Sequence, residues 1–324
     1  WIYVILLWWF GNLSPKKQDR YLLPLFPVLD LVAAIGWLGL VNLMFPSLSL
    51  RTVFTSAILV IVHAIPVISY YPYYLTYFNP LLGGPQQAVK TTLIGWGEGM
   101  EQVAAYLNAK PNAEALYVAA VPVQTLLPYF RGTGENFYTN DIAFRADYVV
   151  LYVSQVQRLA PSPEIVRYFE AQTPETVISI GDVPYAKIYP NTPRILNEVP
   201  PGAVPMNIGL DDKLRLAGYQ LASAQPAVTL YWNALAPLTD NYTVSVRAYA
   251  QDGQLLAQQD QWPVNGLLPT SQWRQGDYVA DTHTLKLPAA AGWEAVNHLE
   301  IVVYNAETGG NIGPPIQFDV DNGL

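Results

Sequence analysis

Two long apolar segments near the start of the chain dominate its hydrophobic pattern. Residues 21–45 (YLLPLFPVLDLVAAIGWLGLVNLMF) and 53–70 (VFTSAILVIVHAIPVISY) contain almost no charged side chains. At about 1.5 Å per helical residue, both are within the range needed to cross a hydrocarbon core of roughly 30 Å. The pattern therefore predicts two membrane-spanning helices, and buried helices of a soluble core are the alternative interpretation.

The first residues of the chain extend this apolar character. Residues 1–10 (WIYVILLWWF) make only half a crossing, so we expect a partial span there, in a sequence that begins within a helix. A signal peptide is disfavoured because no basic stretch precedes the segment and no small-residue cleavage site follows it. The membrane region is predicted over 1–70. The tyrosine-rich start of 71–98 predicts an interfacial segment at the headgroup level.

A small α/β domain is predicted over 99–190. Short apolar runs typical of buried strands alternate with helical patterns, at 95–108 (helix), 115–120 (strand), 123–130 (helix), 147–153 (strand) and 162–172 (helix). In the last helix Ser162 is the expected N-cap, with Pro163 in the first helical position. The region closes on a hairpin expected to turn at Gly181 and Asp182.

The hydrophobic period changes after a proline-rich linker predicted at 191–205. In YTVSVRAYA (242–250) the side chains alternate, with Tyr242, Val244 and Val246 on one face. Strands at this spacing predict a β-sandwich over 206–324, Ig-like or jelly-roll-like. The expected fold class is therefore membrane α-helical spans, then a small α/β domain and a C-terminal all-β sandwich.

Charge and composition exclude several classes of function. The formal charge is −8 and no basic run is present, which argues against a nucleic-acid partner. The chain has no cysteine, and its three histidines lack ligand spacing, so no metal site is predicted. DVDNG near the C-terminus lacks the later ligands of a calcium loop. No G-x-S-x-G elbow or phosphate-binding G-x-x-x-x-G-K occurs.

A basic cluster precedes the first complete span and bears on topology. Lys16, Lys17 and Arg20 would ordinarily mark the cytoplasmic side. Two predicted spans separate the cluster from the C-terminal region, so both lie on the same face. If that region is exported, the cluster violates the positive-inside rule, and binding of a lipid-linked phosphate would explain it.

The stretches KKQDRYLLPLFP and YLTYFNPLLGGPQQAVKTTLIGWGEGMEQVAAYL, together with the predicted sandwich, carry a resemblance to a known family. They resemble membrane glycosyltransferases of the GT-C class, in particular the protein O-mannosyltransferase-like and aminoarabinose-transferase-like enzymes. KKQDRYLLPLFP is similar to their Lys-rich, Arg-Tyr-Leu-Leu-Pro element before a late span. YLTYFNPLLGGPQQAVKTTLIGWGEGMEQVAAYL resembles the segment after the last span of bacterial members, which often carry Asp-Trp-Gly-Gln-Asp-Leu where this chain has GWGEGM. The predicted sandwich is similar to a C-terminal module attached to such enzymes.

The resemblance implies a function and a location. The chain would be the C-terminal part of a plasma-membrane enzyme that uses a polyprenyl-phosphate-linked sugar, with its soluble domains extracytoplasmic. The catalytic carboxylate of that class lies in an upstream loop, so no catalytic residue is expected here and the chain alone should be inactive. Lys16, Lys17 and Arg20 would bind the lipid phosphate.

The partners implied by the resemblance are membrane lipid, the lipid-linked sugar and a glycan or protein acceptor, with no other cofactor. Whether a divalent metal is needed stays open. The alternative function is a membrane-anchored, extracytoplasmic carbohydrate- or protein-binding surface protein without catalysis.

Two further groups of residues are candidates for chemistry. Asp30 and His63 fall at similar depth in neighbouring spans and are expected to pair structurally, to serve an acceptor or lipid channel, or to reach the lipid edge. Trp96 offers a face for stacking on a sugar, and Glu98 and Glu101 could accept sugar hydroxyls. The alternative for the two glutamates is a helix N-terminus, where they complement the helix dipole.

Aromatic side chains of the predicted sandwich have two interpretations. Tyr231, Tyr249, Trp262 and Trp273 could form a carbohydrate platform. Core packing and cross-strand pairing explain them equally well.

Overall fold

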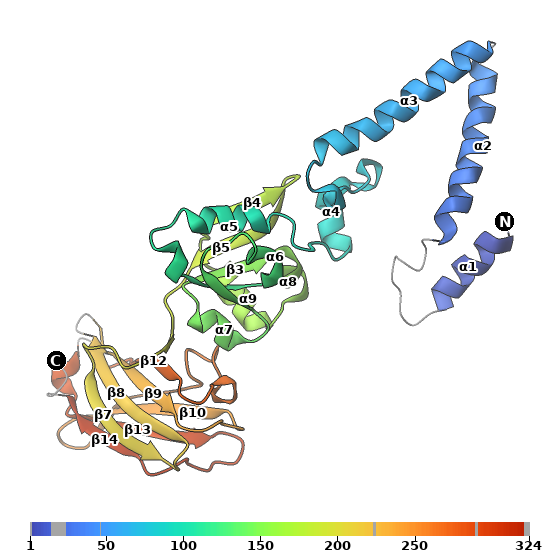
Figure 1. Ribbon diagram of the computed structural model, residues 1–324. Helices are drawn as coiled ribbons and strands as arrows, with labels where there is room; N and C mark the ends of the chain where they lie inside the picture. Colours follow the sequence, from blue (N-terminus) through green and yellow to red (C-terminus); the bar gives the residue numbers. More distant parts are fainter. Residues whose placement is uncertain (1, 14–23, 46, 223–224, 289–290, 321–324) are drawn as a thin grey trace. The chain divides into compact units, whose positions relative to one another are not determined.

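The computed structural model describes residues 2–13, 24–45, 47–222, 225–288 and 291–320 (Figure 1). The chain divides into two compact units, Trp1–Tyr77 and Phe78–Leu324. The α-helices are α1 (Ile2–Leu13), α2 (Phe26–Met44), α3 (Leu48–Ser69), α4 (Gly84–Thr91), α5 (Met100–Asn108), α6 (Val123–Leu126), α7 (Asn140–Arg145), α8 (Val153–Arg158) and α9 (Pro163–Glu170).

The strands belong to three sheets, all in the second unit. They are β1 (Tyr117–Ala120), β2 (Thr133–Asn136), β3 (Tyr148–Tyr152), β4 (Thr176–Ile180), β5 (Val183–Pro190), β6 (Ile195–Leu196), β7 (Val204–Leu210), β8 (Leu214–Ala222), β9 (Ala227–Ala234), β10 (Tyr242–Tyr249), β11 (Leu255–Gln261), β12 (Tyr278–Thr284), β13 (His298–Asn305) and β14 (Ile316–Asp319).

In the first unit, α2 and α3 form a helical hairpin whose helices are long and apolar enough, by length and composition, to cross a membrane. The hairpin is closed near its turn, where Trp37 stacks on Phe54 with ring centroids 6.1 Å apart and Arg51 Nε donates to the carbonyl of Phe45. The helix α3 begins five residues before the predicted segment because the Ser47 side chain caps it, accepting from Leu50 N at 3.2 Å.

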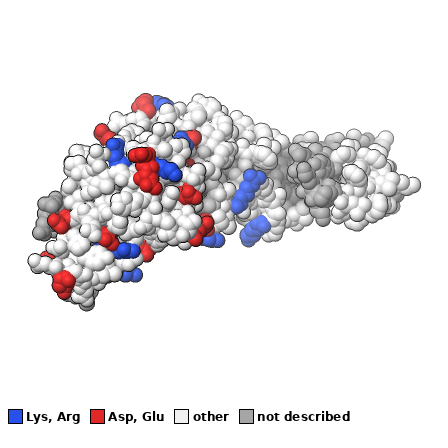
Figure 2. All heavy atoms as spheres, turned by 90° about the horizontal axis from the view of Figure 1, so that it is seen from below, with Lys and Arg blue, Asp and Glu red and all other residues white. Residues whose placement is uncertain are grey.

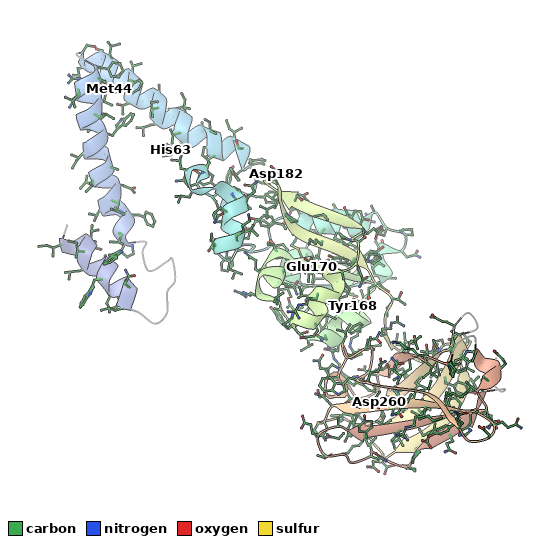
Figure 3. The ribbon with its side chains drawn as sticks, turned by 180° about the vertical axis from the view of Figure 1, so that it is seen from behind. Met44, His63, Tyr168, Glu170, Asp182 and Asp260 are labelled. Carbon is green, nitrogen blue, oxygen red and sulfur yellow. The ribbon has the colours of Figure 1, made fainter. Side chains whose placement is uncertain are left out.

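A mixed five-stranded sheet opens the second unit, in the order β2-β1-β3-β5-β4. β1 is parallel to β2 and β3, whereas β5 is antiparallel to β3 and β4. The predicted strands at 115–120 and 147–153 are confirmed as β1 and β3. The hairpin turn is confirmed, with φ of 55° at Gly181 and 62° at Asp182 (Figure 3).

The helices around this sheet agree with the sequence pattern to different extents. Ser162 caps α9 as predicted, its side chain accepting from Ile165 N at 3.3 Å. The helix predicted over 123–130 is wrong in length, because α6 ends at Leu126. The one predicted over 95–108 begins only at Met100, since the backbone before it adopts positive φ at glycines.

The remaining strands form two antiparallel sheets, ordered β6-β12-β9-β8-β7 and β11-β10-β13-β14. The strand predicted at 242–250 is confirmed as β10, with Tyr242, Val244 and Val246 buried, but Thr243 and Ser245 of its other face are buried as well. Two antiparallel sheets with a shared buried face are consistent with the predicted sandwich. The stretch predicted as a linker contributes β6, which pairs with β12.

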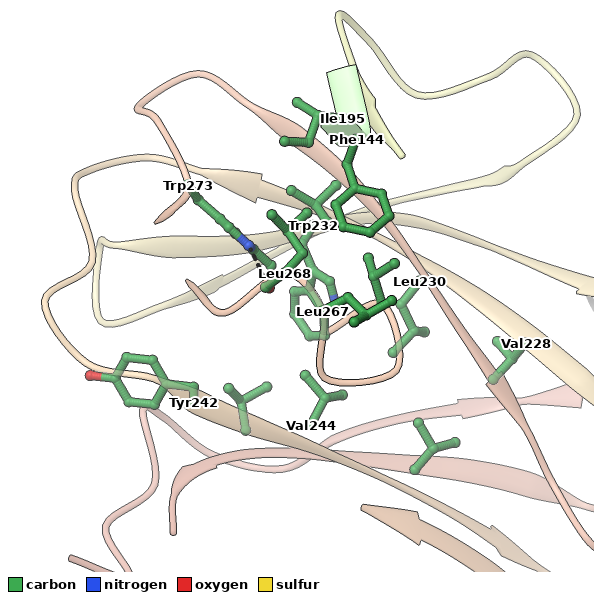
Figure 4. Close-up of a cluster of buried hydrophobic side chains, with 14 of the residues drawn as sticks. Phe144, Ile195, Val228, Leu230, Trp232, Tyr242, Val244, Leu267, Leu268 and Trp273 are labelled. Carbon is green, nitrogen blue, oxygen red and sulfur yellow. Dashed lines mark hydrogen bonds between the residues drawn. The ribbon is translucent and has the colours of Figure 1, made fainter. Parts of the chain in front are cut away.

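One hydrophobic cluster runs from the mixed sheet into the antiparallel sheets. Phe144 of α7 and Ile195 of β6 belong to the same cluster as Trp232, Leu230 and Leu267 of the antiparallel region (Figure 4). Because close-packed interiors resist deformation, this continuity joins the two regions of the second unit into one body.

Candidate functional site

The predicted phosphate ligands Lys16, Lys17 and Arg20 lie outside the described residues.

Asp30 and His63 lie at similar distances from the turn of the α2–α3 hairpin. Asp30 is 14 residues before Met44, and His63 is 15 residues after Leu48, or about 21 and 22 Å along the helices. Met44 and His63 are labelled in Figure 3. The His63 ring donates from Nδ1 to the carbonyl of Leu59 at 2.7 Å. Within the described part of the chain, no hydrogen bond or ion pair joins Asp30 to His63, so their pairing stays a prediction.

The glycine loop, residues 95–99, connects α4 to α5 and is the most tightly constrained of the predicted sites. Gly95, Gly97 and Gly99 have φ of 92°, 118° and 82°. A Cβ on Gly95 would lie 2.5 Å from the Val153 side chain, and one on Gly97 would lie 2.6 Å from Thr125. Glycine is therefore required here both for its backbone angles and for close packing.

Tyr152, at the end of β3, braces this loop. Its hydroxyl accepts from Gly97 N at 3.0 Å and donates toward Glu98, whose carbonyl and Oε2 lie at 3.0 and 3.1 Å. The same Oε2 accepts from Trp96 N at 2.7 Å. Burial, and then the charge of Glu98, raise the pKa of Tyr152 above that of an ordinary tyrosine, so its hydroxyl remains a donor to Glu98.

A second brace holds the segment that enters the loop. Gln157 on α8 accepts from Ile94 N at 3.0 Å through Oε1. Its Nε2 donates to the carbonyls of Val89 and Thr92 at 2.7 and 2.8 Å. One amide thus satisfies three backbone groups around the end of α4 and the start of the loop.

The three residues predicted to contact a sugar, Trp96, Glu98 and Glu101, therefore have different structural roles. The Trp96 side chain is 74% exposed, so its ring is open to a ligand or a lipid surface. Glu98 is used to hold the loop, whereas Glu101 lies in the first turn of α5, as the helix-dipole alternative expects. Sugar contacts by either carboxylate stay a prediction.

Two of the aromatic residues considered for a carbohydrate platform are core residues. Tyr231 and Trp273 are buried, which overturns the platform interpretation for both. Tyr249 stacks on His298 with ring centroids 5.0 Å apart, a cross-strand pair between β10 and β13. Trp262 is 41% exposed.

A charge network that the sequence pattern did not indicate joins α7 to the antiparallel region. Arg145 forks onto the carboxylate of Asp277 at 2.8 and 2.5 Å, and Arg274 reaches Glu135 and Asp141, both at 3.1 Å. These partners are more than a hundred residues apart and share no motif, so only the folded chain brings them together.

Burial and hydrogen bonds shift the pKa values of Glu135 and Tyr117, two members of this network, in opposite directions. Partial burial opposes ionisation of Glu135, but hydrogen bonds from Tyr117 and Arg274 outweigh it and lower the pKa of Glu135. Burial and the hydrogen bond to Glu135 raise the pKa of Tyr117.

Acidic and basic side chains lie interspersed on the face shown in Figure 2. No group of three or more metal-ligating side chains occurs among the described residues.

No family model matches the chain, and no curated protein matches it significantly. Solved structures of glycoside hydrolases show a weak likeness. A calcium-binding mutant of β-glucuronidase 2 from Bacteroides uniformis is 12% identical with a TM-score of 0.23, covering 42% of this chain and 15% of the enzyme. A putative β-galactosidase from Bacteroides fragilis is 17% identical with a TM-score of 0.20, covering 43% and 19%.

This chain therefore spans less than a fifth of those enzymes. Likenesses at such TM-scores carry no argument about fold or activity.

Proposed function

We propose that this chain is the C-terminal part of a membrane glycosyltransferase of the GT-C class, which uses a polyprenyl-phosphate-linked sugar. The observation that carries the proposal is the glycine loop. It lies in the segment whose sequence resembles these enzymes, it follows two helices of membrane-spanning length, and it is braced so that Trp96 is exposed.

In this proposal the parts of the chain have separate roles. Lys16, Lys17 and Arg20 bind the lipid phosphate, and Trp96 contacts the sugar or acceptor. The second unit, with an Ig-like or jelly-roll-like sandwich, is extracytoplasmic and positions the acceptor. The catalytic carboxylate belongs to an upstream segment, as in the enzymes that the sequence resembles.

The test is sugar transfer by the full-length protein in proteoliposomes, with a polyprenyl-phosphate sugar as donor. Combined substitution of Lys16, Lys17 and Arg20 by alanine should lower the transfer rate at least about tenfold, because the donor phosphate would have no cationic side chains to bind it there. The matched control replaces exposed basic residues elsewhere, as the triple alanine variant of Lys213, Lys286 and Arg167. Unchanged use of the donor by the first variant would refute the phosphate role.

Trp96→Ala tests the glycine loop in the same assay, with Trp262→Ala as the control because Trp262 is also exposed. We expect only the Trp96 variant to lose transfer, with unchanged thermal stability.

A second candidate function is a membrane-anchored carbohydrate-binding protein without catalysis. The observation that favours it is a cleft of about 690 Å³ in the second unit, with a largely polar lining. Glycan binding without any transfer by the full-length protein would support this candidate over the first.

A further inference from the structure

A cleft of about 690 Å³ lies where the mixed sheet meets the antiparallel region. This volume is within the range of roughly 300–1,000 Å³ that small-molecule sites occupy. Its polar lining comes from four separate segments of the chain, at Tyr117, Arg145, Asp147, Asn197, Gln275 and Asp277.

The walls of the cleft are fixed by contacts that do not depend on a ligand. Asp147 accepts from Tyr117 N at 2.9 Å, which holds the start of β1 against the start of β3. The fork of Arg145 on Asp277 ties α7 to the segment just before β12, and Asp277 also accepts from Arg274 N at 2.7 Å. Walls that are already ordered add little entropic cost to binding, so the cost falls mainly on the exposed side chains of Asn197 and Gln275.

The charges of the lining argue against an anionic ligand. Arg145 is the one basic residue among the described residues that line the cleft, and the carboxylates of Asp277 and Asp141 already neutralise it. With Asp147 also present, acidic groups exceed basic ones. A phosphate or a carboxylate would therefore meet repulsion and no available cation.

The remaining groups suit a polyhydroxylated ligand. Asn197 and Gln275 are exposed amides, each offering two donors and an acceptor, and Asp147 offers carboxylate oxygens to hydroxyl groups. The ring of Tyr117 and the side chains of Pro193 and Leu196 add apolar surface on which the C–H face of a sugar can pack.

We propose that this cleft binds a neutral carbohydrate, through the amides of Asn197 and Gln275 and the apolar surface beside them. The inference deepens the proposed function by giving the second unit a ligand, and it rests on that proposal only for the ligand's role as acceptor.

The test is calorimetric binding to the full chain in lipid nanodiscs, without any lipid-linked donor. The neutral probes are maltotetraose, cellotetraose and mannotetraose, and tetragalacturonate is the charged probe. We expect at least one neutral probe to bind, and tetragalacturonate to bind at least about tenfold more weakly because of the acidic lining. Absence of binding by all three neutral probes, or tighter binding of tetragalacturonate, would overturn the proposal.

Two variants locate the binding. Asn197→Trp should fill the cleft and weaken binding at least about tenfold, whereas Gln275→Ala should weaken it about fivefold by removing a hydrogen bond. Gln124→Trp places the same large side chain at an exposed glutamine on α6, away from the cleft, and should bind like the unmodified chain. Binding that Asn197→Trp and Gln275→Ala both leave unchanged would contradict the assignment.

The outcomes separate this inference from the proposed function. Neutral glycan binding in the cleft, together with no transfer by the full-length protein, would keep the cleft and reject the glycosyltransferase. Transfer without glycan binding would do the reverse.

Discussion

The ion pair between Arg145 and Asp277 should hold the two regions of the second unit together, and Arg145→Met tests this. The Arg145 side chain is 18% exposed and that of Asp277 is 8% exposed. Removing one partner of a fully buried pair costs roughly 3–5 kcal/mol, because the other charge is left without compensation. Here Asp277 keeps its hydrogen bond from Arg274 N, so we expect a loss of about 2–3 kcal/mol.

For a unit of this size, that loss corresponds to a melting temperature lower by about 4–12 °C. The assay is thermal unfolding of the detergent-solubilised chain, followed by tryptophan fluorescence. Trp232, Trp273 and Trp293 are buried in the antiparallel region and report on it directly.

The control is the same substitution in an exposed ion pair. Arg131 and Glu114 lie 3.7 Å apart and their side chains are 64% and 69% exposed, so Arg131→Met should cost at most about 0.5 kcal/mol. If Arg145→Met lowered the melting temperature no more than Arg131→Met, the fork would not stabilise the junction and the reasoning would be refuted.

Three further predictions concern backbone strain and pH. Gly97→Ala should cost about 1–3 kcal/mol in thermal unfolding, more than Gly253→Ala, where φ is also positive but space is open. The hydrogen bond from Gln317 lowers the pKa of Glu300, so stability should fall as pH drops from about 5 to 3, and fall less in Glu300→Gln. Burial raises the pKa of Tyr189 from 10.0 to about 12, so stability should fall between these pH values, and less in Tyr189→Phe.

Elements with strong local signals were predictable from the sequence. The buried face of α5 consists of Met100, Val103, Ala104 and Leu107, which recur at helical spacing, and all four are fully buried. β10 was recognisable because apolar and polar residue types alternate along it, although Thr243 and Ser245 are buried together with Val244 and Val246. In α5 the period of apolar residues coincides with burial, whereas in β10 the alternation of residue types indicates the strand although both of its faces are covered.

Elements decided by tertiary contacts were not predictable. β2 has the sequence TGEN, with no large apolar residue, and forms a strand because its backbone pairs in register with β1. The residues that line the cleft could not be predicted from the sequence either, since Arg145 and Asp277 are 132 residues apart. The bracing of residues 95–99 by Tyr152 was also missed, because an apolar run gives no indication of where one hydroxyl points.

The strand β3 relates the glycine loop to the cleft. Asp147, which lines the cleft, directly precedes β3, and Tyr152, which braces the loop, ends it. At about 3.3 Å per residue these positions are about 16 Å apart. Energetic effects at such separations are generally additive. Trp96→Ala should therefore leave glycan binding in the cleft unchanged. Asn197→Trp should leave the stability of the glycine loop unchanged. In the proposed glycosyltransferase, an acceptor that contacts both places would have to span the length of the strand, so short acceptors should depend on one of them alone.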